Sequence, residues 1–177
     1  MNTLLDCRRR SFFCLALALA FAPSCKDDDT EDKQRKDIER YITGSLNAEI
    51  DEKDGVYYVP LSVDSSSERV PVEQGDLIEV EYEAMVFGGG LFATSIDSVA
   101  IQNGLEPNHW GGAGAGVEVG VGKLIPGIDR GLLRMALGEQ AIIIFPFTLG
   151  YGKKYVGLVP PQSALVFNVL ITKVEKR

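Results

Sequence analysis

Hydrophobic and polar residues alternate along much of the second half of the chain. In "GDLIEVEYEAMV" (75–86), apolar side chains at 78, 80 and 82 alternate with glutamates at 79, 81 and 83. Such alternation is typical of an antiparallel sheet strand with one buried face. Shorter apolar or alternating segments at 55–63, 117–122, 141–147 and 164–174 predict further strands. Pro60 is expected to close the first of these, because proline cannot donate a backbone hydrogen bond.

Two segments instead have helical spacing. In 124–140, Pro126 suits a first helical turn, Gly138 can stop the helix, and Ile128, Leu132 and Met135 share one face. Residues 30–46 predict a second helix that Thr30 caps and Gly44 ends. It would dock by a narrow stripe made by Ile38, Tyr41 and Ile42. Strands dominate, so the predicted fold class is α+β.

Residues 96–116 break the pattern. The segment "IDSVAIQNGLEPNHWGGAGAG" is rich in small residues and contains His109 and Trp110, the single histidine and the single tryptophan of the chain. It has little to bury, so we expect a mobile loop outside the core. A lone histidine without neighbouring ligands does not indicate a metal site, and we expect no metal and no cofactor.

The N-terminus indicates export. Three arginines at 8–10 precede the short apolar run "SFFCLALALAFA", as in a secretory signal at residues 1–24. The twin-arginine route is a weaker alternative. "APSC" resembles a lipoprotein cleavage box, which predicts that Cys25 is lipidated. A plain signal peptide that leaves Cys25 unmodified is the other interpretation.

An acidic stretch follows the predicted lipidation site. We interpret 25–54 as a polar tether, beginning "CKDDDTEDK", with the N-terminal helix, and 55–177 as the globular domain. The stretch resembles the surface-export signal of Bacteroidetes lipoproteins, although an ordinary solvated linker explains it as well. The predicted location is the cell envelope, anchored by lipid to the outer membrane on its periplasmic side or at the cell surface.

Composition excludes several kinds of chemistry. The other two cysteines, Cys7 and Cys14, leave with the signal, so a chain beginning at Cys25 has no thiol for a disulfide or a nucleophile. Removal of residues 1–24 takes three arginines and one aspartate, which leaves 15 basic and 24 acidic residues. This acidic balance argues against a nucleic-acid partner. A serine–histidine–aspartate site is not convincing with one histidine in a glycine-rich loop.

The order of segments resembles FKBP-type peptidyl-prolyl cis–trans isomerases. The matching segments are "GDLIEVEYEAMV", "GGGLFATS", "VEVGVGKLIPGIDRGLLRMALGEQ", "FPFTLGYG" and "LVPPQSALVFNVLITKVE". They span roughly 75–175, interrupted by 96–116, and "YG" followed by "PPQSALVFNV" is the most specific element. The resemblance implies a bent antiparallel sheet wrapped around one short helix, here with an extra N-terminal helix, and proline-containing polypeptides as substrates.

The family builds its site from apolar side chains between helix and sheet. The resemblance implies catalytic positions at Tyr82, Phe92, Tyr151 and Phe167. It implies substrate-binding positions at Val117, Leu124, Ile125, Ile128 and Leu158. Pro160 and Pro161 would fix the end of a loop over this pocket, and the Leu158 amide or the Tyr151 hydroxyl would hold the substrate.

Three positions depart from the family pattern. Ala93 stands where the family usually has an aspartate, Ile128 replaces a tryptophan at the pocket floor, and Val117 replaces an aromatic wall residue. We expect a wider pocket with reduced catalysis. Two other functions therefore stay open, namely a non-catalytic module that binds proline-containing or apolar segments, and a structural subunit whose contact is 96–116.

The lipid anchor can be tested in cells. If Cys25 is lipidated, the protein should partition into the detergent phase and take up radioactive palmitate. The Cys25→Ala variant should lose both properties. A wild-type protein that stays in the aqueous phase without label would contradict the lipoprotein prediction.

Overall fold

The computed structural model describes residues 26–63, 69–112 and 116–177, and the side chains of 26–28 and 63 are not described. The predicted signal segment 1–24 and the lipidation site Cys25 lie outside the described residues. Among the described helices, none is long and apolar enough to cross a bilayer.

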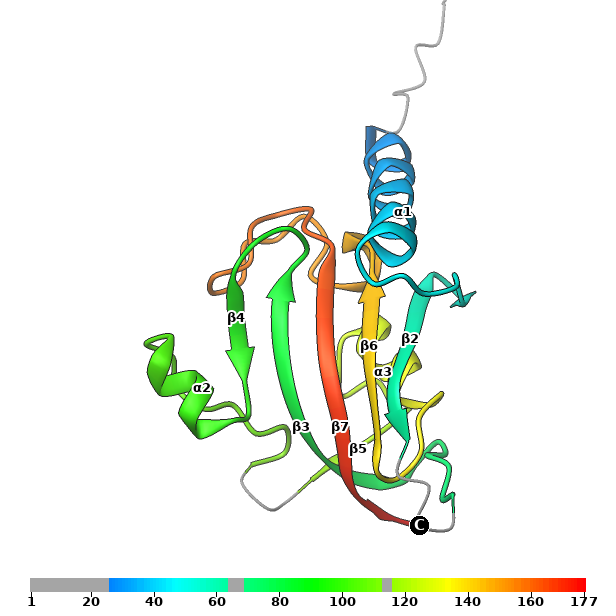
Figure 1. Ribbon diagram of the computed structural model, residues 1–177. Coiled ribbons are helices and arrows are strands. Elements are labelled where there is room, and N and C mark those ends of the chain that lie inside the picture. Colours follow the sequence, from blue (N-terminus) through cyan, green and yellow to red (C-terminus); the bar gives the residue numbers. More distant parts are fainter. Residues whose placement is uncertain (1–25, 64–68, 113–115) are drawn as a thin grey trace, which may run out of the picture.

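The described strands form one antiparallel sheet in the order β1-β2-β6-β7-β3-β4, with β5 paired to β3 (Figure 1). The strands are β1 (Glu52–Lys53), β2 (Val56–Val63), β3 (Leu77–Val86), β4 (Leu91–Thr94), β5 (Val117–Glu118), β6 (Glu139–Phe145) and β7 (Leu165–Glu175). The long strands curve together in Figure 1, so the predicted bent antiparallel sheet and the α+β class are confirmed.

Alternation along the strands divides the buried side chains between the two faces of the sheet. Tyr58, Ile143 and Phe167 belong to the larger core cluster. Their immediate neighbours Tyr57, Ile144 and Val166 belong to a second cluster. Because consecutive strand residues point to opposite faces, the sheet is buried on both sides in its central part.

The short helix α3 (Pro126–Leu132) covers the face with the larger cluster, where Ile128 and Leu132 are buried. Pro126 begins the helix as expected, but the helix ends at Leu132, before Gly138. Two glycines let its backbone approach β6. A Cβ on Gly127 would lie well inside 3.0 Å of the Phe145 ring, and one on Gly131 would crowd Ile143 in the same way.

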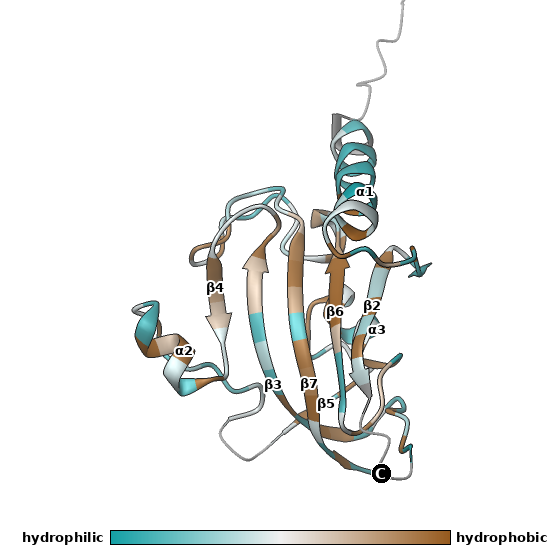
Figure 2. Cartoon of the chain, viewed as in Figure 1, coloured by the Kyte–Doolittle hydropathy of each residue, from teal (hydrophilic) through white to brown (hydrophobic). Residues whose placement is uncertain are grey.

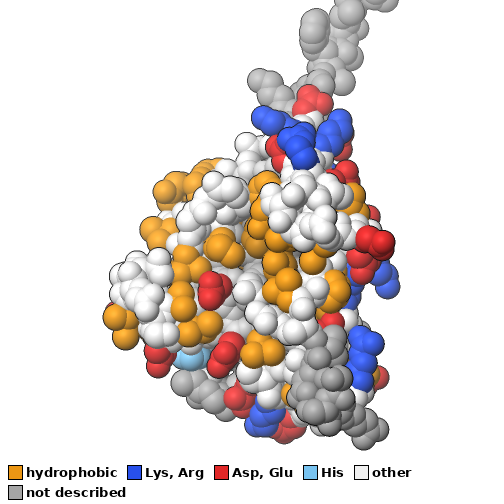
Figure 3. Space-filling view, in the orientation of Figure 1, with side chains coloured by type: hydrophobic (Ala, Val, Ile, Leu, Met, Phe, Trp, Pro, Cys, Tyr) orange, Lys and Arg blue, Asp and Glu red, His pale blue; other side chains and the backbone are white. Residues whose placement is uncertain are grey.

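The N-terminal helix α1 (Lys26–Gly44) covers the opposite face through Ile38 and Ile42, which are both fully buried. Figure 2 shows that most of α1 is hydrophilic, and Figure 3 shows hydrophobic side chains gathered beside it on the sheet. The docking stripe and the end at Gly44 agree with the sequence prediction. The predicted start was wrong, because Thr30 lies inside the helix. Acidic residues are favourable in a first helical turn because they complement the helix dipole, so the sequence of 27–29 is compatible with the earlier start.

Other local predictions need correction. Pro60 does not close β2, which continues to Val63 with a register shift between Pro60 and Ser62. The proline is tolerated there because β1 pairs only with the start of β2, which leaves an open edge. The strand expected at 117–122 is only two residues long, since positive-φ glycines at 120 and 122 turn the chain away.

A buried carboxylate fixes the turn between α3 and β6. Glu139 accepts hydrogen bonds from the Tyr58 hydroxyl and, at 3.0 Å, from the Ala136 backbone N–H. The Arg69 guanidinium lies 3.8 Å from the same side chain. Burial and the neighbouring carboxylate raise the pKa of Tyr58, so this phenol remains a donor. A buried charge is tolerated here because its oxygens are satisfied.

The close packing of α3 gives a stability prediction. Gly127→Ala should lower the free energy of unfolding by about 1–3 kcal/mol, because the added methyl group overpacks the Phe145 ring. Urea unfolding measures this difference. Gly90→Ala is the matched control, since a Cβ at Gly90 meets nothing within 4 Å. Equal stability of the two variants would show that α3 does not approach β6 closely.

Candidate active site

A cavity of about 190 Å³ lies where α3 and the segment before it face the sheet and two loops. Most of its lining is aromatic or aliphatic, with a polar edge. The lining residues are Tyr82, Phe92, Ala93, Asn108, Trp110, Lys123, Leu124, Ile125, Ile128, Tyr151 and Phe167. The Lys123 ammonium is paired with Glu118 at 2.7 Å, so its charge is already compensated.

Phe167 of β7 is the centre of the aromatic lining. Its ring meets Phe92 edge-on at 5.9 Å between centroids and lies 6.2 Å from the ring of Tyr82. Beneath it, Phe145 stacks on Phe167 at 5.7 Å. Tyr151 meets Phe92 at 6.4 Å and 76°. Such edge and stacked contacts fix the ring positions, so the cavity has a defined shape.

The structure brings most of the predicted site residues together. Seven of the nine line the cavity: Tyr82, Phe92, Leu124, Ile125, Ile128, Tyr151 and Phe167. Val117 is buried in the core cluster and Leu158 is 60% exposed, and neither lines the cavity. Tyr151, which lies between Gly150 and Gly152, is partly buried against the core. The functional roles of these residues stay predictions.

The loop from Phe147 to Gln162 carries Tyr151 past the cavity. It is closed by backbone bonds from Gly152 N to Phe147 O (3.0 Å) and from Gln162 N to Gly152 O (2.8 Å). A further pair of bonds joins Val156 and Val159. Pro160 and Pro161 follow this pair directly and precede Gln162, whose φ is 55°. The prolines thus lie at the end of the loop, as expected.

The loop is also held by α1, which the sequence did not reveal. The Gln34 side-chain amide donates to the carbonyl of Gln162 at 2.7 Å. The side-chain oxygen of Gln34 accepts a hydrogen bond from the Phe147 N–H at 3.0 Å. One side chain therefore ties the two ends of the loop together. A glutamine on the polar side of a helix carries no sequence signal for this contact.

The prediction that 96–116 lies outside the core was wrong. The segment includes α2 (Asp97–Gln102), and Trp110 is partly buried against the main cluster. Its indole stacks on Tyr82 at 4.2 Å and 21°, and lies 6.1 Å from Phe167. The sequence did not predict this contact with Tyr82, because a single aromatic residue next to a glycine-rich run gives no hydrophobic periodicity. Residues 113–115 lie outside the described part of the chain.

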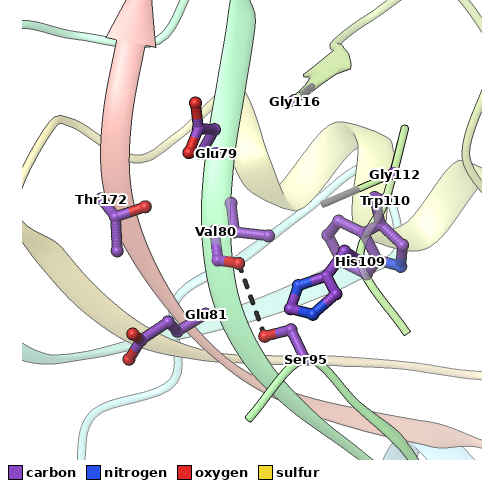
Figure 4. A pocket seen from close by; sticks show the side chains of 9 residues that line it. All are labelled: Glu79, Val80, Glu81, Ser95, His109, Trp110, Gly112, Gly116 and Thr172. Atoms are coloured by element: carbon purple, nitrogen blue, oxygen red, sulfur yellow. Dashed lines mark hydrogen bonds between the residues drawn. The ribbon is translucent and has the colours of Figure 1, made fainter. Parts of the chain in front are cut away.

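A second, polar cavity of about 260 Å³ adjoins Trp110 on the side of β3 (Figure 4). Figure 4 shows the Glu79 and Glu81 carboxylates on the side of β3 toward Thr172, with the His109 ring on the other side. The Nε2 atom of His109 lies 3.8 Å from the Oδ1 atom of Asp97. Among the described residues, no group of three or more potential ligands could hold a metal ion. This arrangement does not assemble an acid–base pair.

Two phenols of the aromatic cavity remain protonated at neutral pH. Burial raises the pKa of Tyr82 and of Tyr151 above the usual value of about 10. Both hydroxyls can therefore donate hydrogen bonds to a ligand. Neither can act as a base under these conditions, because burial disfavours the charged phenolate.

Comparison with known proteins identifies the family. The family model described as FKBP-type peptidyl-prolyl cis-trans isomerase matches residues 68–172. The chain belongs to this family.

Curated FKBP-type relatives agree with the match. FK506-binding protein 1 of Saccharomyces cerevisiae is 33% identical over 101 residues, which are 56% of this chain and 77% of the yeast protein. Peptidyl-prolyl cis-trans isomerase FKBP10 of Homo sapiens is 38% identical over 104 residues, which are 58% of this chain and 16% of the human protein. The chain thus spans only a small part of the human relative.

A solved structure shows the same fold. The crystal structure of FkpA from Escherichia coli superposes with a TM-score of 0.61 at 23% identity. The match covers 84% of this chain and 61% of that chain. It extends beyond the FKBP-type segment of residues 68–172.

The contact between α1 and the loop gives a prediction. Gln34→Ala should increase hydrogen exchange of the loop amides in 147–162, because it removes both side-chain bonds and exposes the Phe147 N–H. Exchange measured by mass spectrometry tests this. Arg40→Ala is the matched control on the same helix, since its side chain is 76% exposed and forms its ion pair with Asp37 of α1, away from the loop. Unchanged loop exchange in Gln34→Ala would refute the proposed tie.

Proposed function

We propose that the protein is a peptidyl-prolyl cis–trans isomerase that assists the folding of cell-envelope proteins. The observation that carries the proposal is the aromatic cavity centred on Phe167, found in a chain of the FKBP-type family. Curated relatives are named peptidyl-prolyl cis-trans isomerases, which supports the same activity here. The substrates would be polypeptide segments that contain proline.

The cavity suits this reaction because no proton has to be transferred. Rotation about an X–Pro bond disrupts the resonance of the amide against a barrier of roughly 18–20 kcal/mol. The twisted amide is less dipolar than the planar one, so an apolar cavity favours it relative to water. Ile125, Ile128 and Phe167 supply such surroundings. An acid–base pair is not required.

The rim of the cavity would orient the substrate. Tyr151 lines the cavity and its phenol stays protonated, so its hydroxyl can donate to a substrate carbonyl. The Leu158 amide, on the same loop, is the other candidate donor. The loop is held at both ends by Gln34, which would keep these donors in place during rotation.

The proposed location is the cell envelope, with the chain anchored by a lipid on Cys25. The support comes from sequence, namely the signal-like segment 1–24 and the acidic residues after Cys25. A lipid anchor would hold the domain near newly exported polypeptides. α1 would then lie between the anchor and the sheet.

A non-catalytic binding module is the alternative function. Ala93, Val117 and Ile128 favour it, because each is smaller or less polar than the residue usual in the family. Binding depends on the cavity being apolar, whereas catalysis also depends on how it orients the twisted amide. Loss of shaped contacts should therefore lower the rate more than the affinity.

A protease-coupled assay separates the two functions. The purified protein should accelerate the cis-to-trans conversion of an Ala-Leu-Pro-Phe p-nitroanilide peptide, and a series that varies the residue before proline gives its preference. Tyr151→Ala should reduce kcat/KM by about tenfold, in line with the loss of one hydrogen bond and one aromatic contact.

Tyr155→Ala is the matched control on the same loop, because its side chain is 70% exposed and does not line the cavity. It should keep the wild-type rate. A wild-type protein that binds the peptide by calorimetry but does not accelerate its isomerisation would establish the binding module instead.

A further inference from the structure

The Tyr82 hydroxyl is a buried polar group without a partner. Tyr82 is only 1% exposed, and among the described residues its hydroxyl is the one buried side-chain polar atom that makes no hydrogen bond. The methyl side chain of Ala93, which lines the same cavity, offers it no oxygen. A buried hydroxyl left without a hydrogen bond destabilises the folded state. Such a group calls for a ligand that satisfies it.

Trp110 lies directly against this phenol. The two rings are stacked at 4.2 Å and 21°. The indole N–H is near enough to the phenol oxygen to offset part of the rise that burial causes in the pKa of Tyr82, but it makes no hydrogen bond of good geometry with that oxygen. The indole therefore positions Tyr82 without satisfying its hydroxyl. Both residues line the aromatic cavity, and Tyr151 lies close enough to influence the ionisation of Tyr82. The unpaired group is thus part of the cavity wall.

Hydrogen bonds fix the position of Trp110 within residues 96–116, here called the insertion because they interrupt the segments that match the family. Just before the insertion, Thr94 Oγ1 donates to the Tyr82 carbonyl at 2.8 Å, and Ser95 Oγ accepts from the Tyr82 N–H at 2.9 Å. Just before the tryptophan, Asn108 N donates to Thr94 O at 2.7 Å. The side chains of Thr94 and Ser95 are therefore bonded to the strand residue that carries the phenol, and Asn108 is linked to it through Thr94.

Glycines complete the return of the chain to the sheet. Gly111 and Gly116 have φ angles of 80° and 68°, which residues with a side chain rarely adopt. A Cβ on Gly111 would overlap the Gly116 carbonyl, and one on Gly116 would lie 2.8 Å from Ile78 O. These glycines let the backbone at Gly111 lie directly against Gly116, next to Trp110, whose ring lines the cavity.

We propose that Trp110 and the Tyr82 hydroxyl are substrate-contacting groups that determine ligand specificity. The indole supplies, from the insertion, an aromatic wall against the proline ring, and the hydroxyl donates a hydrogen bond to a carbonyl of the same peptide segment. The proposal rests on the proposed function, because it deepens the description of the same pocket. The smaller side chains at Ala93, Val117 and Ile128 led us to expect a wider pocket. In this proposal, Trp110 of the insertion supplies the aromatic wall of that pocket instead.

Fluorescence tests the contact of Trp110 directly, since it is the only tryptophan of the chain. Titration with acetyl-Ala-Leu-Pro-Phe-amide should shift its emission to shorter wavelength, because the peptide covers the indole. The matching peptide with alanine in place of proline should give a smaller shift at the same concentration. Calorimetry on the same samples measures binding independently. Binding with unchanged emission would overturn this proposal alone, whereas no binding would overturn the proposed function as well.

Three variants separate contact from structural support. Trp110→Ala should weaken peptide affinity about tenfold, and Trp110→Phe should restore part of it. Ile101→Ala, also in the insertion but 76% exposed on α2, should leave affinity unchanged. If Trp110→Ala lowers the melting temperature without changing the affinity of the folded protein, or strengthens binding, Trp110 is a support or a plug and the proposal fails.

Tyr82→Phe tests whether the hydroxyl binds the peptide, because we expect it to maintain or raise stability while it weakens binding. Removal of an unpaired buried hydroxyl should leave the melting temperature unchanged or raise it. The same change should weaken the affinity for the peptide about tenfold, the value of one hydrogen bond of about 1.4 kcal/mol. A lower melting temperature with unchanged affinity would assign the hydroxyl to the fold and overturn the proposal.

Discussion

The close approach of α3 to β6 is the constraint on which the site depends. Gly127 and Gly131 are one helical turn apart and face Phe145 and Ile143, so the helix backbone lies directly on strand side chains. This places Ile128 at the edge of the cavity and leaves room for Phe145 to stack beneath Phe167. A helix held further out would leave these rings without a wall. The cavity is therefore a consequence of two missing side chains as much as of the aromatic ones.

Much of the fold could be predicted because its signals are local. The alternation around Tyr82 identifies β3, and the spacing of Ile128 and Leu132 identifies the helix that packs on the sheet. The resemblance to FKBP-type proteins then named seven of the cavity-lining residues. Tyr82, Phe92, Ile128 and Phe167 lie on regular elements, where periodicity and burial agree, whereas the loop positions of Leu124, Ile125 and Tyr151 came from the resemblance alone.

The remaining features depend on contacts between distant segments. Gln34 and Gln162 are far apart in sequence, and nothing in either residue type indicates that they meet. Trp110 stands between "EPNH" and "GGAGAG", which form no hydrophobic pattern, so its packing on Tyr82 follows only from the path of the chain. The start of α1 was missed for a different reason, because a run of charged residues suits a solvated tether as well as a first helical turn. Long-range pairing and isolated anchor residues are what sequence patterns leave undetermined.

The sheet extends beyond the segment that the family model recognises. β2 ends at Val63, before residue 68, yet it pairs with β6 from Tyr57 to Val63. A chain trimmed to the recognised segment would leave β6, with its three consecutive isoleucines, as an open sheet edge. Exposed apolar edges recruit strands from other molecules, so the trimmed chain would be prone to aggregate. The residues before the recognised segment therefore protect the solubility of the domain as well as complete its core.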